Sequence, residues 1–73
     1  MSIEFSDHAK RQLRRRKISQ KLVLSSVRNP QEIIGSYRDR KLRRKQVGSK
    51  ILEVVTRAEG SKTIVITAYY LKK

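Results

Sequence analysis

A chain of 73 residues can form one small domain and no more. It contains no Cys, which excludes disulfides, thiolate zinc sites and thiol catalysis, and no apolar run approaches the length of a membrane span. Nineteen Lys and Arg residues against six Asp and Glu residues give a net charge of +13, which predicts a polyanionic partner that relieves the self-repulsion.

The first 30 residues predict a short strand followed by two helices. Residues 3–5 alternate like a strand, and Ser6 is a typical N-cap for a helix over residues 7–17. A second helix is expected from residue 19 to about residue 28, because the residue before Pro30 is pushed out of the helical region. The first residues do not resemble a signal peptide, so we expect a cytoplasmic protein without a membrane partner.

After Pro30 the hydrophobic period changes from 3.6 toward 2, which predicts strands over residues 32–37, 40–47, 50–57 and 63–71. Gly48 and Gly60, each followed by Ser, suit the tight turns of hairpins. The sequence therefore predicts a single α+β domain over residues 1–73. We expect a short N-terminal strand and a helical hairpin packed on one face of an antiparallel four-stranded meander.

Twelve of the 19 cations fall in two clusters, residues 10–17 and 38–45. Leu42 lies inside the second cluster and Val47 follows it closely, which favours a strand over a solvated tail. Alternation would then place Arg40 and Arg44 on one face, with cations about 6–7 Å apart along the strand, close to the spacing of phosphates along a single strand of nucleic acid. The alternative is a solvated edge strand whose Lys residues prevent aggregation. The candidate RNA-binding residues are Arg11, Arg14, Arg15, Arg16, Lys17, Arg38, Lys41 and Lys45.

Few residues suit proton transfer. His8 is the only histidine, and it serves either as a general acid or base or as a structural hydrogen-bonding group. Tyr69 and Tyr70 point to opposite faces of the last strand, so either one of them reaches the face away from the helices or both fill the margins of the core. The carboxylates are dispersed, which argues against a Mg²⁺ site, and we expect no metal or other cofactor. RNA cleavage would then use the substrate's own 2′-hydroxyl, with Arg and Lys stabilising the charge that develops on the phosphate.

Three segments carry a resemblance to a known family: FSDHAKRQLRRRKIS, VLSSVRNPQEII and ILEVVTRAEGSKTIVITAYY. They resemble a family of small domains of unknown function, which is itself similar to the BrnT and RelE/ParE-type toxins of type II toxin–antitoxin systems. The resemblance implies a metal-independent mRNA endoribonuclease, acting on free or ribosome-bound mRNA and neutralised by an acidic antitoxin. ParE-type relatives act on gyrase instead, so the fold alone does not fix the activity.

The resemblance also implies site residues. His8 and Arg16 match the pattern of the first helix, and Tyr69 matches the Tyr of the last strand. The strand that often holds catalytic cations in RelE-like toxins corresponds to residues 40–47. The candidate catalytic residues are His8, Arg40, Arg43, Arg44 and Tyr69.

The sequence leaves two alternatives to a ribonuclease toxin. One is a non-catalytic RNA-binding or ribosome-associated module, in which the same cations bind phosphates with a steep salt dependence. The other is a domain whose basic face docks an acidic protein without any nucleic acid.

Overall fold

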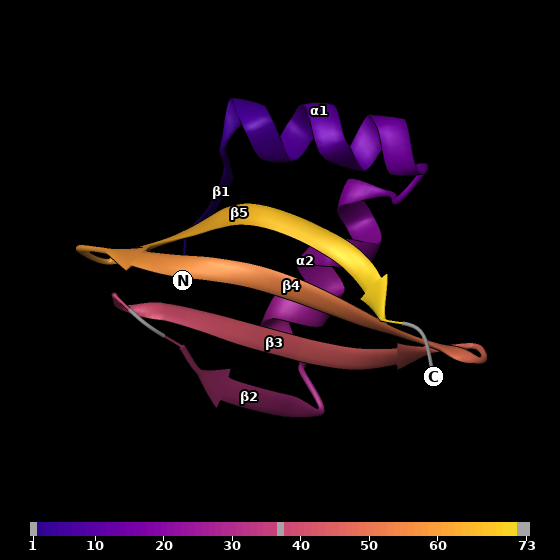
Figure 1. Cartoon of the computed structure of the whole chain (residues 1–73). Helices are drawn as coiled ribbons and strands as arrows, with labels where there is room; N and C mark the ends of the chain where they lie inside the picture. Colours follow the sequence, from indigo (N-terminus) through magenta and orange to yellow (C-terminus); the bar gives the residue numbers. More distant parts are fainter. Residues whose placement is uncertain (1, 37, 72–73) are drawn as a thin grey trace.

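Five strands form one mixed sheet with the order β1-β5-β4-β3-β2, and two helices pack against one of its faces (Figure 1). The computed structural model describes residues 2–36 and 38–71. The elements are β1 (Ser2–Phe5), α1 (Asp7–Arg16), α2 (Gln20–Arg28), β2 (Glu32–Gly35), β3 (Arg40–Val47), β4 (Lys50–Glu59) and β5 (Lys62–Leu71).

The predicted α+β fold is confirmed. Strands β2 to β5 form the expected antiparallel meander, and β1 adds a fifth strand by pairing parallel to β5. Strand β2 ends at Gly35, two residues before the predicted end, and residue 37 lies outside the described part of the chain. No helix within residues 2–36 and 38–71 is long and apolar enough to cross a membrane.

Local chemistry sets the helix ends. The Ser6 hydroxyl accepts a hydrogen bond from the Ala9 amide (3.0 Å), so it caps α1 as predicted. The other end of α1 turns at Lys17, whose φ of 57° lies in the left-handed region. There the Ile18 amide donates to the Leu13 carbonyl (2.9 Å), and the Lys17 amide donates to the Arg14 carbonyl (3.3 Å). This is a Schellman motif, in which Gly is the usual residue at the position of Lys17.

The core lies between the two helices and the sheet. The helix layer contributes five buried apolar residues, Ala9, Leu13, Ile18, Val23 and Val27. The sheet contributes Leu52, Val54, Val65 and Ala68. Tyr70 and Val47 pack against the margin of this core, so both point toward the helices.

The opposite face of the sheet, which neither helix covers, is called the uncovered face below. Figure 1 views the sheet from this side, with α2 passing behind β4. Because side chains alternate along a strand, the residues between the core positions of β4 and β5 point to the uncovered face. Glu53 and Tyr69 are therefore on it, since their neighbours Leu52, Val54 and Tyr70 pack toward the helices.

Candidate functional site

The uncovered face is balanced in charge. Its residues pair in register across the sheet, and they include four glutamates and four cations: Glu4, Glu32, Glu53, Glu59, Arg40, Arg44, Arg57 and Lys62. Each glutamate takes part in an ion pair, for example Arg57 with Glu59 (3.0 Å) and Lys62 with Glu4 (3.0 Å). The excess of positive charge among the described residues therefore lies on the helix side of the sheet and at its edges.

A buried carboxylate lies at the centre of the uncovered face. Glu53 is only 4% exposed, although no helix covers it. Its Oε1 accepts a hydrogen bond from Arg44 Nε (2.7 Å), and its Oε2 accepts one from the Tyr69 hydroxyl. The register explains this arrangement, because Glu53 pairs with Arg44 on β3 and with Tyr69 on β5. Three neighbouring strands thus bring an arginine, a carboxylate and a tyrosine into one hydrogen-bonded network, called the Arg44–Glu53–Tyr69 network below.

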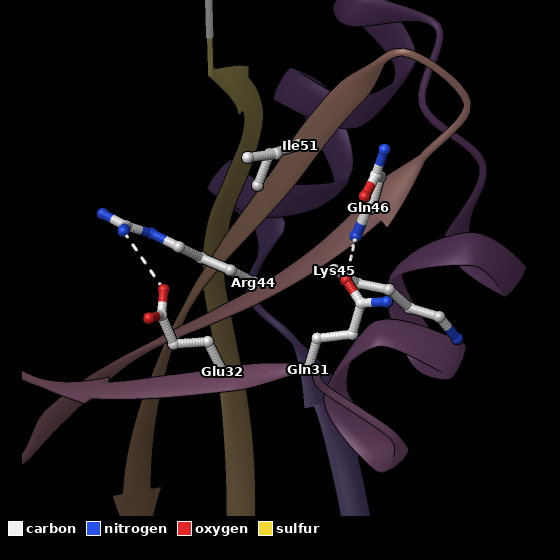
Figure 2. Close-up of a pocket in the computed structure, with 6 residues that line it drawn as sticks. All are labelled: Gln31, Glu32, Arg44, Lys45, Gln46 and Ile51. Atoms are coloured by element: carbon white, nitrogen blue, oxygen red, sulfur yellow. Dashed lines mark hydrogen bonds and ion pairs between the residues drawn. The ribbon is translucent and has the colours of Figure 1, made fainter. Parts of the chain in front are cut away.

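Arg44 also reaches the outer strand of the sheet. Its Nη1 atom lies 3.3 Å from Glu32 Oε1, and this ion pair is drawn in Figure 2. The hydrogen bond and charge of Glu53, followed by those of Glu32, raise the pKa of Arg44 above its usual value. About a third of the Arg44 side chain is exposed (32%), so an anion in solvent can approach it.

The environment of Tyr69 keeps its hydroxyl protonated. Burial raises the pKa of Tyr69 to about 12, and the hydrogen bond to the Glu53 carboxylate adds to this effect. At neutral pH the phenol is therefore a hydrogen-bond donor and a potential proton donor, rather than a base.

Arg16 connects the first helix to this network. At the end of α1, its Nη1 atom donates to the Ala68 carbonyl (2.8 Å) and to the Thr67 hydroxyl (3.3 Å). Its guanidinium carbon lies 6.0 Å from the centroid of the Tyr69 ring, at the outer limit of a cation–π contact. Arg16 is therefore the member of the first cation cluster that reaches Tyr69.

The structure divides the predicted catalytic residues. Arg44 and Tyr69 lie together in the network. Arg40 points to the same face, but it is the first residue of β3 and pairs with Arg57, away from the network. Arg43 points to the helix side, where its Nη1 donates to the Val27 carbonyl (3.0 Å) and its Nε donates to Thr56 Oγ1 (3.2 Å). Arg43 thus ties β3 to α2.

The remaining candidates lie on the helix side or in the loop before β3. His8 is exposed in the first turn of α1, away from the network. Of the predicted RNA-binding residues, Arg11, Arg14, Arg15, Arg16, Lys17, Arg38 and Lys41 are exposed. Lys45 is half-buried and donates a hydrogen bond to Ser25 Oγ (2.9 Å) on α2.

Glu53 is the residue that the sequence analysis missed. The sequence offered one signal, a single carboxylate inside the apolar run Ile51–Val55. Alternation places Glu53 on the face opposite to Leu52 and Val54, and this is the face of Tyr69 when the two strands pair with these residues side by side. Among residues 2–36 and 38–71, no three His, Asp or Glu side chains come together in a group that could hold a metal ion.

Residues 5–70 match the model of a protein family described as "Domain of unknown function (DUF4258)". The chain belongs to this family. The match includes Arg16, Arg44, Glu53 and Tyr69, so the whole network lies in the part of the chain that defines the DUF4258 domain. Comparisons with curated proteins and with solved structures found no match.

Proposed function

We propose that this DUF4258 protein is the toxin of a type II toxin–antitoxin pair and cleaves mRNA in the cytoplasm without a metal ion. The Arg44–Glu53–Tyr69 network on the uncovered face carries the proposal. It combines a carboxylate that accepts a proton, a guanidinium that binds a phosphate and a phenol that donates a proton. The α+β architecture agrees with the resemblance to RelE-type and BrnT toxins.

The network supplies each proton transfer that the reaction needs. When the phosphate of the RNA binds Arg44, Glu53 Oε1 gives up its hydrogen bond from Arg44 and takes the proton from the 2′-hydroxyl, whose oxygen then attacks the adjacent phosphorus. Arg44 stabilises the additional negative charge on the phosphate oxygens. As the bond from phosphorus to the 5′-oxygen breaks, Tyr69 gives its proton to that oxygen. The products are a 2′,3′-cyclic phosphate and a 5′-hydroxyl.

The direct hydrogen bond between the tyrosine and the glutamate resets the site. After the reaction Glu53 is protonated and the Tyr69 oxygen is negative, and the two groups are already hydrogen-bonded in the free protein. The proton passes from the carboxyl to the phenolate, which restores the starting state without any further group.

The first cation cluster provides the RNA-binding surface in this proposal. The cations of α1 are exposed, and none of them forms an ion pair within the part of the chain that the structure describes. Because Arg16 reaches the edge of β5 beside Tyr69, a strand of RNA bound along the end of α1 is directed onto the uncovered face. With a net charge of +13, an acidic antitoxin is the expected partner that neutralises the protein.

Induced expression tests the proposal. The wild-type protein and an Arg44→Ala variant are produced in cells, and growth and mRNA length are followed. Arg57→Ala is the matched control, because Arg57 is also an ion-paired arginine on the uncovered face. We expect growth arrest and mRNA loss with wild type and with Arg57→Ala, but not with Arg44→Ala. Normal growth with intact mRNA on expression of the wild-type protein would refute the proposal.

The exposed cations of α1 also support a second candidate, a non-catalytic RNA-binding or ribosome-associated module. Binding through these cations is expected to weaken steeply with salt. Tight binding at low salt, with RNA of unchanged length after incubation, would favour this candidate over the nuclease.

A further inference from the structure

One flank of α1 borders the uncovered face of the sheet. Thr67 pairs in register with Val55, which follows the core residue Val54, so the Thr67 side chain lies on the uncovered face. Its hydroxyl donates a hydrogen bond to Gln12 Oε1 and accepts one from Arg16 Nη1 (3.3 Å). The flank of α1 that carries Gln12 and Arg16 therefore meets the edge of β5 on the uncovered side.

The helical period divides the other cations of α1 between two flanks. At 3.6 residues per turn, Arg15 lies about 60° around the helix axis from Gln12, and Arg11 lies about 100° from it. Lys10 and Arg14 lie about 160° from Gln12, on the opposite flank of the helix. All four cations are exposed. Arg11 and Arg15 are therefore the pair nearer to the uncovered face.

The spacing of Arg11 and Arg15 suits a nucleic acid strand. They are four residues apart, so they lie one above the other on the helix surface, about 6 Å apart along the axis. This distance is close to one phosphate step of a single strand. Neither arginine forms an ion pair within the part of the chain that the structure describes. The pair can therefore bind two successive phosphates.

The proposed chemistry gives the bound strand a direction. In an in-line displacement the attacking and leaving oxygens lie on opposite sides of the phosphorus. In the proposed reaction Glu53 Oε1, on the side of Arg44 and β3, takes the proton of the attacking 2′-oxygen. Tyr69 on β5 gives its proton to the leaving 5′-oxygen. This 5′-oxygen belongs to the nucleotide on the 3′ side of the cut, so that nucleotide lies toward β5.

We propose that the RNA on the 3′ side of the cut passes Arg16 and binds along α1 through Arg15 and Arg11; this inference rests on the proposed nuclease function. Because α1 packs beside β5, the strand reaches it directly after leaving Tyr69 (Figure 1). The RNA on the 5′ side of the cut then crosses β3 toward β2, at the other edge of the sheet. Lys10 and Arg14 add long-range attraction without contacting this strand.

An uncleavable oligonucleotide tests the direction separately from catalysis. A hexamer of 2′-deoxyuridine carries a nitroxide spin label at its 3′ end or at its 5′ end, and the amide signals of the wild-type protein are recorded by NMR. We expect the 3′ label to broaden the signals of α1 and the 5′ label to broaden those of β2 and β3. Equal broadening of α1 by the two labels, or stronger broadening by the 5′ label, would overturn the inference.

Two double variants of equal charge test which flank binds. The affinity of the same hexamer, now with a fluorophore, is measured by anisotropy over a range of salt concentrations. Arg11→Gln/Arg15→Gln is expected to lower the slope of log affinity against log salt by about 1.4, because each phosphate contact to a single strand contributes about 0.7. Lys10→Gln/Arg14→Gln removes the same charge and is expected to lower the slope by less than about 0.5.

The outcomes separate this inference from the nuclease proposal. The amide spectrum shows whether each double variant is folded, and equal decreases in slope from two folded variants would overturn the inference. If the direction and the flank hold but RNA is never cleaved, the nuclease proposal fails and the binding of the strand along α1 stands. If RNA is cleaved but the 3′ label does not broaden α1, the nuclease proposal stands and the inference fails.

Discussion

Replacing Tyr69 by Phe removes one hydroxyl from the Arg44–Glu53–Tyr69 network and nothing else. The hydroxyl donates to a carboxylate that is only 4% exposed, so Glu53 Oε2 loses a partner that water replaces poorly. A hydrogen bond to a charged group contributes about 1.5–3 kcal/mol. We therefore expect the free energy of unfolding at pH 7 to fall by about 2 kcal/mol.

The same hydroxyl predicts a specific dependence on pH. The pKa of Tyr69 is raised from 10.0 to about 12 in the folded protein, so the stabilisation is fully present below pH 10 and is lost as the pH rises through 12. A shift of this size corresponds to about 2.7 kcal/mol, and solvent screening at a half-buried site reduces it to about 1–2 kcal/mol. The stability difference between wild type and Tyr69→Phe is therefore expected to close across this range.

Urea unfolding of both proteins between pH 7 and pH 12 measures the difference directly. The high positive charge changes the stability of both proteins with pH, but it cancels in the difference. Tyr70→Phe is the matched control, because Tyr70 is the next residue of β5 and packs on the helix side. A difference between wild type and Tyr69→Phe that stays constant from pH 9 to pH 12 would show that the Tyr69 hydroxyl does not stabilise the fold through its hydrogen bond to Glu53.

Three further changes have expected outcomes. Lys17→Gly should raise the free energy of unfolding by about 1 kcal/mol, because Lys17 lies at a φ of 57° where Gly has no steric cost; thermal melting would show an unchanged or lower Tm if this is wrong. Ser6→Ala should lower the free energy of unfolding by about 1 kcal/mol, because α1 loses its N-cap; an unchanged midpoint of urea unfolding would contradict that role. Arg43→Ala should lower the free energy of unfolding by about 2 kcal/mol, because it removes the hydrogen bonds from Arg43 to Val27 and Thr56. Arg40→Ala should change it by less than about 0.5 kcal/mol, and equal effects of the two variants would show that the faces of β3 are wrongly assigned.

Much of the fold follows from local signals in the sequence. Ser6 and Ser19 cap the two helices as their positions suggested, and Pro30 follows the end of α2. Gly48 and Gly60 take positive φ values of 62° and 61° at the two hairpin turns. These features depend on a few neighbouring residues, so the sequence predicts them well.

Features that depend on strand register were harder to predict. The parallel pairing of β1 with β5 joins residues about 60 positions apart, so a pattern of neighbouring residues cannot predict it. The alternation of β3 correctly separates Arg43 from Arg44, but it does not show that Arg43 bonds to α2. The position of Glu53 between Arg44 and Tyr69 needs the register of three strands at once. The site therefore became visible only in the folded chain.

The balance of charge on the uncovered face also depends on strand register, and so it could not be predicted from the sequence. The sequence shows six cations within residues 38–45, which suggests a basic sheet. Pairing across strands places Glu32 and Glu53 beside Arg44, so those cations do not make the uncovered face basic. The exposed cations of α1 provide the positively charged surface instead.

The chemistry of the cleaved ends tests whether the Arg44–Glu53–Tyr69 network cleaves RNA without a metal ion, as proposed. Purified protein is incubated with mRNA, free and on ribosomes, in the presence of a metal chelator, beside Glu53→Gln and the control Glu59→Gln. We expect fragments with 2′,3′-cyclic phosphate and 5′-hydroxyl ends from wild type and Glu59→Gln, and uncut RNA from Glu53→Gln. Uncut RNA from the wild-type protein under every condition, or cleavage by a folded Glu53→Gln variant at the wild-type rate, would contradict the proposed mechanism.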